Sequence, residues 1–206
     1  MNKLKILALV VSAGLILSGC GKSSSPTATP APTPKPRKVD KNVNVEPVEN
    51  RPYVRLEPRE DGKAVTLTIV EVKKAAEDAE YEIEYNAGSL VQGAFGAIDS
   101  LKTLPIKKEI LLGSCSTGGK CTYNTDVTGG DLTLRFGNPD YTLKSEWSFT
   151  EGATKLKTLS SRDAKFTLDI SKAKSTTSTV IIHLAPGYPG TLTGKVIAGP
   201  YLVAPF

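Results

Sequence analysis

The sequence predicts an all-β protein, an antiparallel β-sandwich of about nine or ten strands. Apolar and polar residues alternate with period two over several short segments, as in strands with one buried and one exposed face. Turn-forming pairs such as Gly118-Gly119 and Pro186-Gly187 separate these segments. A helical pattern is nearly absent, and a turn or two of helix is expected only over residues 73–79. Strands that follow one another without intervening helices favour a sandwich over a βαβ fold.

The alternation gives the position of each strand. It is clearest over residues 141–149, where the odd-numbered residues from Tyr141 to Phe149 form one face that includes Trp147. Over residues 65–72 the apolar parity changes between Ile69 and Val70, which predicts a β-bulge or a change of sheet. In chain order the expected strands cover residues 53–57, 65–72, 81–85, 107–112, 121–124, 132–136, 141–149, 166–170, 179–184 and 195–203.

This arrangement resembles an immunoglobulin-like or fibronectin type III-like module with extra strands. The resemblance concerns the architecture alone, because the sequence lacks the Cys…Trp…Cys pattern of immunoglobulin domains and an early-strand tryptophan.

The first residues, 1–19, read as a signal peptide. Lys3 and Lys5 precede an apolar run that is too short to span a bilayer of about 30 Å as a helix. The run ends in Leu17-Ser18-Gly19-Cys20, which resembles the lipobox of bacterial lipoproteins. The resemblance implies that Cys20 becomes the lipidated first residue of an extracytoplasmic, membrane-anchored protein. The alternatives are an ordinary secretory signal with an incidental cysteine, or an uncleaved anchor.

The segment that follows, residues 20–45, is predicted to be a disordered tether. Five prolines alternate with Thr, Ala and Lys, and apolar side chains larger than alanine are almost absent before Val39. Such a composition buries too little apolar surface to fold and favours extended polyproline II. A proline-rich docking site for another protein is the alternative.

The lipobox resemblance also bears on which membrane holds the chain. Gly21 directly follows the cysteine, at the position where an aspartate would indicate retention in an inner membrane, so the outer membrane is favoured if the cell has two.

The predicted domain, residues 46–206, is close to neutral. The whole chain holds 26 basic and 21 acidic residues, but the basic excess lies in the signal and the tether. A nucleic-acid-binding domain needs a concentrated basic face, so nucleic acid is not an expected partner.

A narrower resemblance covers much of this domain. The segments KAVTLTIVEV, YEIEYNAG, QGAFGAID and KEILLGSCSTGGKCTYNTDVTGGDLTLRF resemble a group of uncharacterised lipoproteins from uncultured, small-genome bacteria. The central pattern runs from Gly113 to Tyr123. The resemblance supports the lipoprotein interpretation and implies no activity.

Cys115 and Cys121 are predicted to form a structural disulfide. They are the two cysteines that remain once Cys20 is lipidated, and export places them in an oxidising space. The five residues between them include Gly118-Gly119, which permit a tight hairpin. A redox role would favour a C-x-x-C motif, which is absent.

The sequence offers no recognisable catalytic or metal-binding motif, so we expect no enzyme, no metal and no cofactor. His183, the single histidine, is interpreted as a mid-strand residue with a half-covered ring, and no G-x-S-x-G elbow accompanies it. Asn124, Asp126 and Asp131 are grouped in one segment, which leaves a calcium loop as an alternative to ordinary turn formation.

The expected function is that of a displayed interaction or structural module, with an envelope protein or a glycan as the partner. The first candidate for a recognition loop is APGYPG, where turn-forming pairs flank Tyr188. The alternative for Tyr188 is packing over the end of the sandwich. Two alternative functions stay open: a small-ligand-binding lipoprotein, and an enzyme with an unrecognised carboxylate or Ser-Lys site.

Overall fold

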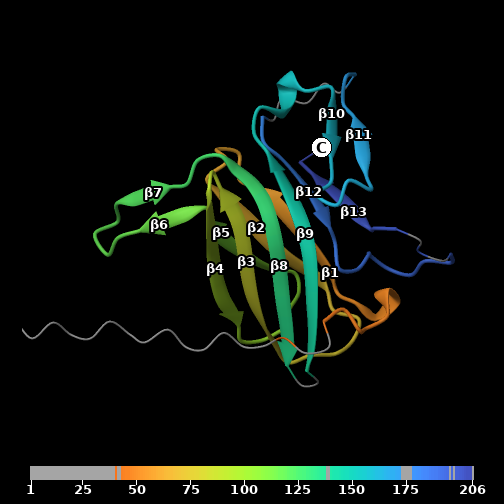
Figure 1. Ribbon diagram of the computed structural model, residues 1–206. Coiled ribbons are helices and arrows are strands. Elements are labelled where there is room, and N and C mark those ends of the chain that lie inside the picture. Colours follow the sequence, from red (N-terminus) through yellow and green to blue (C-terminus); the bar gives the residue numbers. More distant parts are fainter. Residues whose placement is uncertain are drawn as a thin grey trace, which may run out of the picture. The chain divides into compact units, whose positions relative to one another are not determined.

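The computed structural model describes residues 40, 43–137, 140–172, 178–194, 196 and 198–205. These residues form thirteen β-strands and two short 3-10 helices, η1 (Val48–Asn50) and η2 (Ala153–Lys155). The prediction of an all-β antiparallel sandwich is confirmed (Figure 1). The predicted signal, Cys20 and nearly all of the rest of the predicted tether lie outside the described residues.

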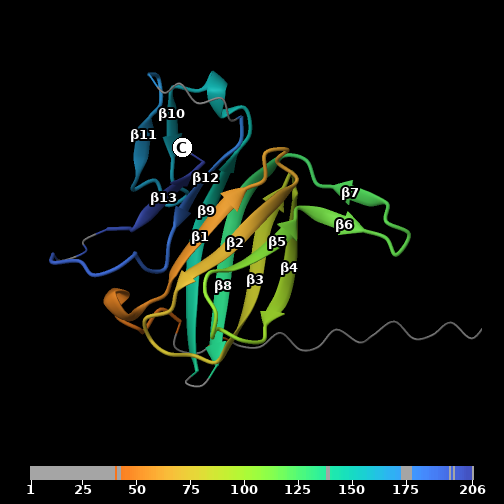
Figure 2. The ribbon, with the colours of Figure 1, turned by 180° about the vertical axis from the view of Figure 1, so that it is seen from behind.

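Two antiparallel sheets make up the sandwich, seen from opposite sides in Figures 1 and 2. The larger sheet has the order β13 (Tyr201–Ala204), β12 (Val180–Leu184), β9 (Tyr141–Thr150), β8 (Val127–Gly137), β3 (Asp78–Ala87) and β4 (Leu90–Ile98). The smaller sheet has the order β1 (Tyr53–Pro58), β2 (Ala64–Glu71) and β5 (Ile106–Leu111). Two hairpins lie outside these sheets: β6 (Gly113–Cys115) with β7 (Cys121–Tyr123), and β10 (Thr158–Ser160) with β11 (Thr167–Asp169).

The main core lies between the sheets and is centred on the inner face of β9. All five residues predicted for that face, from Tyr141 to Phe149, are buried. The ring of Trp147 is fully buried, with its centroid 6.5 Å from that of Tyr85 and 6.2 Å from that of Phe149. Aromatic side chains bury large apolar areas and so dominate the energetics of such a core.

The predicted irregularity in β2 is a β-bulge. Tyr53 pairs with Glu71, but the next residue of β1, Val54, pairs with Ile69, so Val70 has no partner residue opposite it on β1. One extra residue reverses the facing of the side chains that follow, which explains the change of apolar parity at Ile69–Val70.

A second, smaller core covers the outer face of β12. Val180 and Ile182 pack with Leu159, Ile170 and Ala153 beneath the β10–β11 hairpin. The opposite face of β12 points into the main core. A strand covered on both faces needs apolar residues at both parities, which accounts for the continuous run from Val180 to Ile182.

Several predicted elements need correction. No helix forms over residues 73–79: this stretch contains bends, and β3 already begins at Asp78. Strands β4, β6 and β10 were not predicted. The last expected strand is shorter than predicted, because β13 begins only at Tyr201, after Pro200.

The folded part begins before Glu46, the predicted start of the domain. Both carboxylate oxygens of Asp40 accept hydrogen bonds from the Arg135 guanidinium in β8, at 2.5 and 2.8 Å, and Glu82 of β3 accepts a third at 2.7 Å. The Asn44 side chain accepts from the backbone N–H of Lys144 at 3.0 Å and donates to its carbonyl at 2.8 Å. Asp40 and Asn44 thus join the incoming chain to the outer face of the larger sheet.

We expect Arg135→Met to loosen this junction without unfolding the sandwich. The loss of charge-assisted, partly buried hydrogen bonds should lower the free energy of unfolding by about 1–2 kcal/mol. Limited proteolysis should then cut near residues 40–46 faster than in the wild type.

Lys144→Met is the matched control. It removes the more exposed Lys144–Asp131 ion pair of 3.0 Å on the same sheet face, and exposed pairs contribute about 0–1 kcal/mol. Equal protease sensitivity of the two variants would contradict the assignment.

Candidate interaction surface

The sandwich has four edge strands, and three of them carry residues that oppose further strand pairing. Charged side chains and proline blunt an edge, because unpaired N–H and C=O groups otherwise attract another strand. The strand β5 carries Lys107, Lys108 and Glu109, and β1 carries two charged residues and Pro58. The short β13 lies between Pro200 and Pro205.

The fourth edge, β4, has no such protection. Its nine residues, LVQGAFGAI, include no charge and no proline. Leu90 and Val91 are exposed, and Phe95 is 86% exposed, the most exposed large apolar side chain among the described residues. In both views β4 lies beside β5, on the side of the sandwich opposite β12 and β13 (Figures 1 and 2). We call the strand Leu90–Ile98 the β4 edge.

The β3–β4 hairpin determines which backbone groups of the β4 edge are free to pair. Its turn has two residues, Gly88 with φ of 57° and Ser89, between the paired residues Ala87 and Leu90. Residues that flank a two-residue turn form a hydrogen-bonded pair, and such pairs alternate along an antiparallel ladder. The even-numbered residues of β4 therefore bond to β3. The N–H and C=O groups of Val91, Gly93, Phe95 and Ala97 point away from it.

On the outer face of the sheet, the strand next to this edge carries a row of glutamates. Glu80, Glu82 and Glu84 of β3 stand opposite Ala97, Phe95 and Gly93 of β4. On the inner side, the Tyr81 ring fills the space that a side chain at Gly96 would need. The aromatic ring therefore lies over Gly96, and a larger residue at this position would displace the ring.

Tyr188 is not an exposed recognition residue. Its side chain is buried, and the ammonium of Lys73 lies 3.9 Å from the ring centroid. The neighbouring Gly187 packs against the backbone of Arg51 and Pro52. Tyr188 therefore follows the alternative interpretation given for it, in which its side chain packs over the end of the sandwich.

Cys115 and Cys121 are bonded, as predicted. Their sulfur atoms lie 1.99 Å apart and their Cα atoms 4.0 Å apart, opposite each other in the β6–β7 hairpin. The bridge closes the tip of this hairpin, outside both sheets.

His183 is more deeply buried than predicted. Its ring is fully buried, and Nε2 lies 3.0 Å from the Ser145 hydroxyl oxygen. Nδ1 has no hydrogen-bond partner among the described residues. Burial lowers the pKa of His183 to about 3, so the ring is neutral at pH 7. A serine beside a histidine suggests nucleophile and base, but a base this weak and this enclosed favours a structural role.

The grouped Asn124, Asp126 and Asp131 do not converge on one point. The Asn124 amide donates to the Tyr85 hydroxyl at 2.9 Å, and Asp131 pairs with Lys144 on the outer sheet face. Within the described ranges, no group of three or more His, Cys, Asp or Glu side chains is placed to hold a metal ion.

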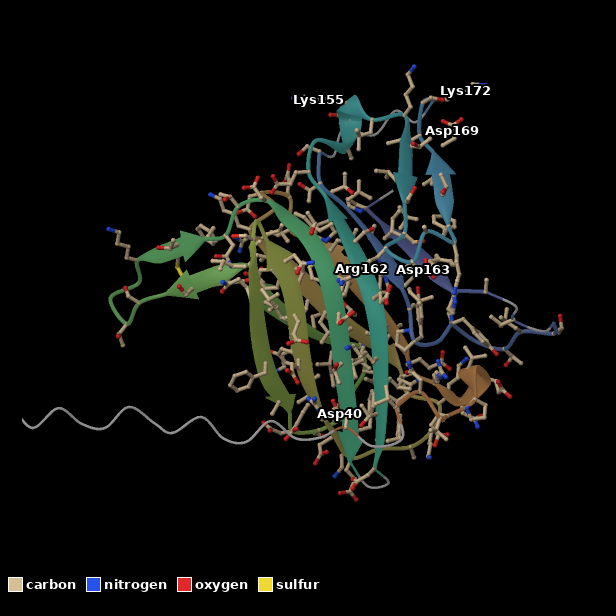
Figure 3. All side chains as sticks on the ribbon, in the orientation of Figure 1. Asp40, Lys155, Arg162, Asp163, Asp169 and Lys172 are labelled. Carbon is tan, nitrogen blue, oxygen red and sulfur yellow. A yellow bond between two sulfur atoms is a disulfide. The ribbon has the colours of Figure 1, made fainter. Side chains whose placement is uncertain are left out.

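A polar hollow of about 320 Å³ lies between β9, Asn44 and the loop before β11. Lys144, Glu146, Asp163 and Lys165 line it. Figure 3 shows Asp163 at the end of the β10–β11 hairpin that faces β9, far from Lys155 and Lys172. Its carboxylate accepts hydrogen bonds from Ser161 at 2.6 Å and Tyr201 at 2.7 Å, which lower its pKa. These bonds hold the hairpin in place and occupy both carboxylate oxygens.

The described helices contain no segment long and apolar enough to cross a membrane. No protein-family model, curated protein or solved structure matches this chain. The β4 edge itself could have been predicted from the Gly88-Ser89 turn and the uncharged run that follows, but two glycines and three alanine or glutamine residues obscured its alternation.

Burial of His183 predicts a stability that falls in mild acid. The folded pKa of about 3 lies below the ordinary value near 6.5, so below pH 6.5 the unfolded chain binds a proton that the folded chain does not. The free energy of unfolding should therefore drop by up to roughly 1.4 kcal/mol per pH unit between pH 6.5 and 5, measured by denaturant titration.

The control is His183→Gln, which keeps a polar partner for Ser145 but does not titrate. Its stability should be nearly flat over this window, which lies above the ordinary carboxylate pKa values. Parallel pH profiles for the wild type and the variant would rule out His183 as the cause.

Proposed function

We propose that this chain is a membrane-anchored extracytoplasmic lipoprotein whose β-sandwich is an interaction module. Cys20 is the lipid attachment site in this proposal, and residues 20–39 are the tether. The folded module begins at Asp40, which Arg135 holds against the larger sheet. The partner is a protein, and it meets the module at the β4 edge.

The exposed, uncharged β4 edge is the observation that carries the proposal. Strand addition to an open edge is a recurring mode of protein recognition, because backbone hydrogen bonds supply affinity and side chains supply specificity. A protein strand can use the whole row of outward backbone groups of this edge, whereas a glycan would meet a single open aromatic ring there, Phe95. Away from the edge, a lysine ammonium lies over the ring of Tyr188 (Lys73, 3.9 Å) and over the ring of Tyr123 (Lys63, 4.9 Å).

The anchor is tested by Cys20→Ala. Two or three acyl chains hold a protein on a membrane, at about 0.8 kcal/mol per buried CH₂. The variant should lose incorporation of labelled fatty acid and leave the membrane fraction or remain unprocessed. Normal labelling of the variant would refute Cys20 as the lipidation site.

The edge is tested by photo-crosslinking on intact cells. A photoreactive phenylalanine derivative at position 95 should give a discrete protein adduct, because Phe95 is the most exposed apolar group of the edge. The same group at Leu156, which is 45% exposed and lies next to the β10–β11 hairpin, is the control and should give little. Equal adducts at both positions, or none at position 95, would count against a β4 contact surface.

A further inference from the structure

We propose that the partner at the β4 edge is a second copy of this chain, paired antiparallel through β4. The inference rests on the proposed function for the choice of surface. It adds the identity of the occupant and the register, and each follows from the geometry of β4.

The register follows from the backbone groups that are free. Val91, Gly93, Phe95 and Ala97 direct their N–H and C=O groups outward, and a two-fold axis must pair these residues with one another. If the two-fold axis passes midway between the Ala94 residues of the two copies, Val91 pairs with Ala97 of the second copy. Gly93 then pairs with Phe95 of the second copy. Every outward group of the four residues then has a partner in both copies. Centring on Gly93 or on Phe95 leaves one of the four residues beyond the end of the other strand.

The side chains fit the same register. Each Phe95 lies opposite Gly93 of the other copy, where the missing side chain leaves room for the ring. Within one chain the same pairing already occurs between Tyr81 and Gly96. Each Phe95 ring, 86% exposed in the single chain, would lose part of its exposed surface by lying on the second copy's strand.

Charge does not oppose this pairing. Neither β4 strand carries a charge, and the glutamate rows of the two β3 strands would be three strand spacings apart, about 14 Å. That separation exceeds the screening length of about 8 Å at physiological salt. Tethering both copies to one membrane also raises their effective concentration.

The assembly closes at two copies. An isologous contact uses the same edge of both chains, so no β4 edge remains for a third. The opposite edge of the larger sheet, β13, lies between Pro200 and Pro205, and β5 carries Lys107 and Lys108. Neither strand invites further pairing.

The test is oxidative crosslinking of the full chain in membranes. In the proposed register Ala94 lies opposite its own copy in a non-hydrogen-bonded pair, with Cα atoms about 4.5 Å apart. That separation is within the range for a disulfide of about 4.4–6.8 Å. Ala94→Cys, treated with copper phenanthroline and air, should run as a dimer on a non-reducing gel.

Gln92→Cys is the matched control. Gln92 lies opposite Gly96 of the second copy and about 13 Å from its own counterpart, so it should stay monomeric. Phe95→Lys, an exposed change that leaves the core intact, should raise the dimer dissociation constant about tenfold or more, measured by sedimentation of the detergent-solubilised chain.

A monomeric wild type in sedimentation, with no dimer from Ala94→Cys of normal thermal stability, would overturn the inference. So would a stronger dimer from Gln92→Cys than from Ala94→Cys. Fatty-acid labelling and photo-crosslinking at position 95 separate this failure from failure of the proposed function. A labelled chain that crosslinks to a foreign protein keeps the function and rejects the second copy.

Discussion

Each backbone N–H and C=O group in a sheet needs a hydrogen-bond partner, and an open sandwich leaves one unpaired row at every edge. This constraint explains much of the periphery of the molecule. Lysines lie on β5, proline and charges lie on β1, and prolines flank β13. The β4 edge departs from the pattern, because it carries neither charge nor proline and its outward N–H and C=O groups are open to another strand or to water.

Inside the sheet, the sequence pattern of each strand depends on which of its two faces other side chains cover. The strands β8 and β9 have one face in the main core and a more polar outer face, which explains why apolar and polar residues alternate along them. In β12 both faces are covered, by the main core and by the β10–β11 hairpin. His183 therefore lies in a dry environment, where Ser145 satisfies one ring nitrogen and burial keeps the ring neutral.

Features that depend on residues close in sequence could be predicted, whereas features that depend on distant residues could not. The inner face of β9, the bulge at Val70 and the disulfide hairpin each follow from residues close in sequence. Full burial of His183 could not be predicted, because it depends on residues distant in sequence, such as Ser145, 38 residues away. The start of the fold was missed because Asp40 is held by Arg135, 95 residues away. The β4 strand was missed because its small residues give no clear alternation, although its two-residue turn was visible.

The features that made β4 hard to recognise are the ones that suit it to pairing. More than half of this strand is Gly, Ala or Gln, and its larger side chains Leu90, Val91 and Phe95 are exposed, so it buries little against its own sheet and its sequence shows no amphipathic pattern. The same small residues let a neighbouring backbone approach closely and leave room for an aromatic ring opposite a glycine. An unpaired edge of this kind promotes open-ended aggregation. A two-fold contact removes that hazard, because it consumes the edge in both copies and leaves only edges that carry charge or proline.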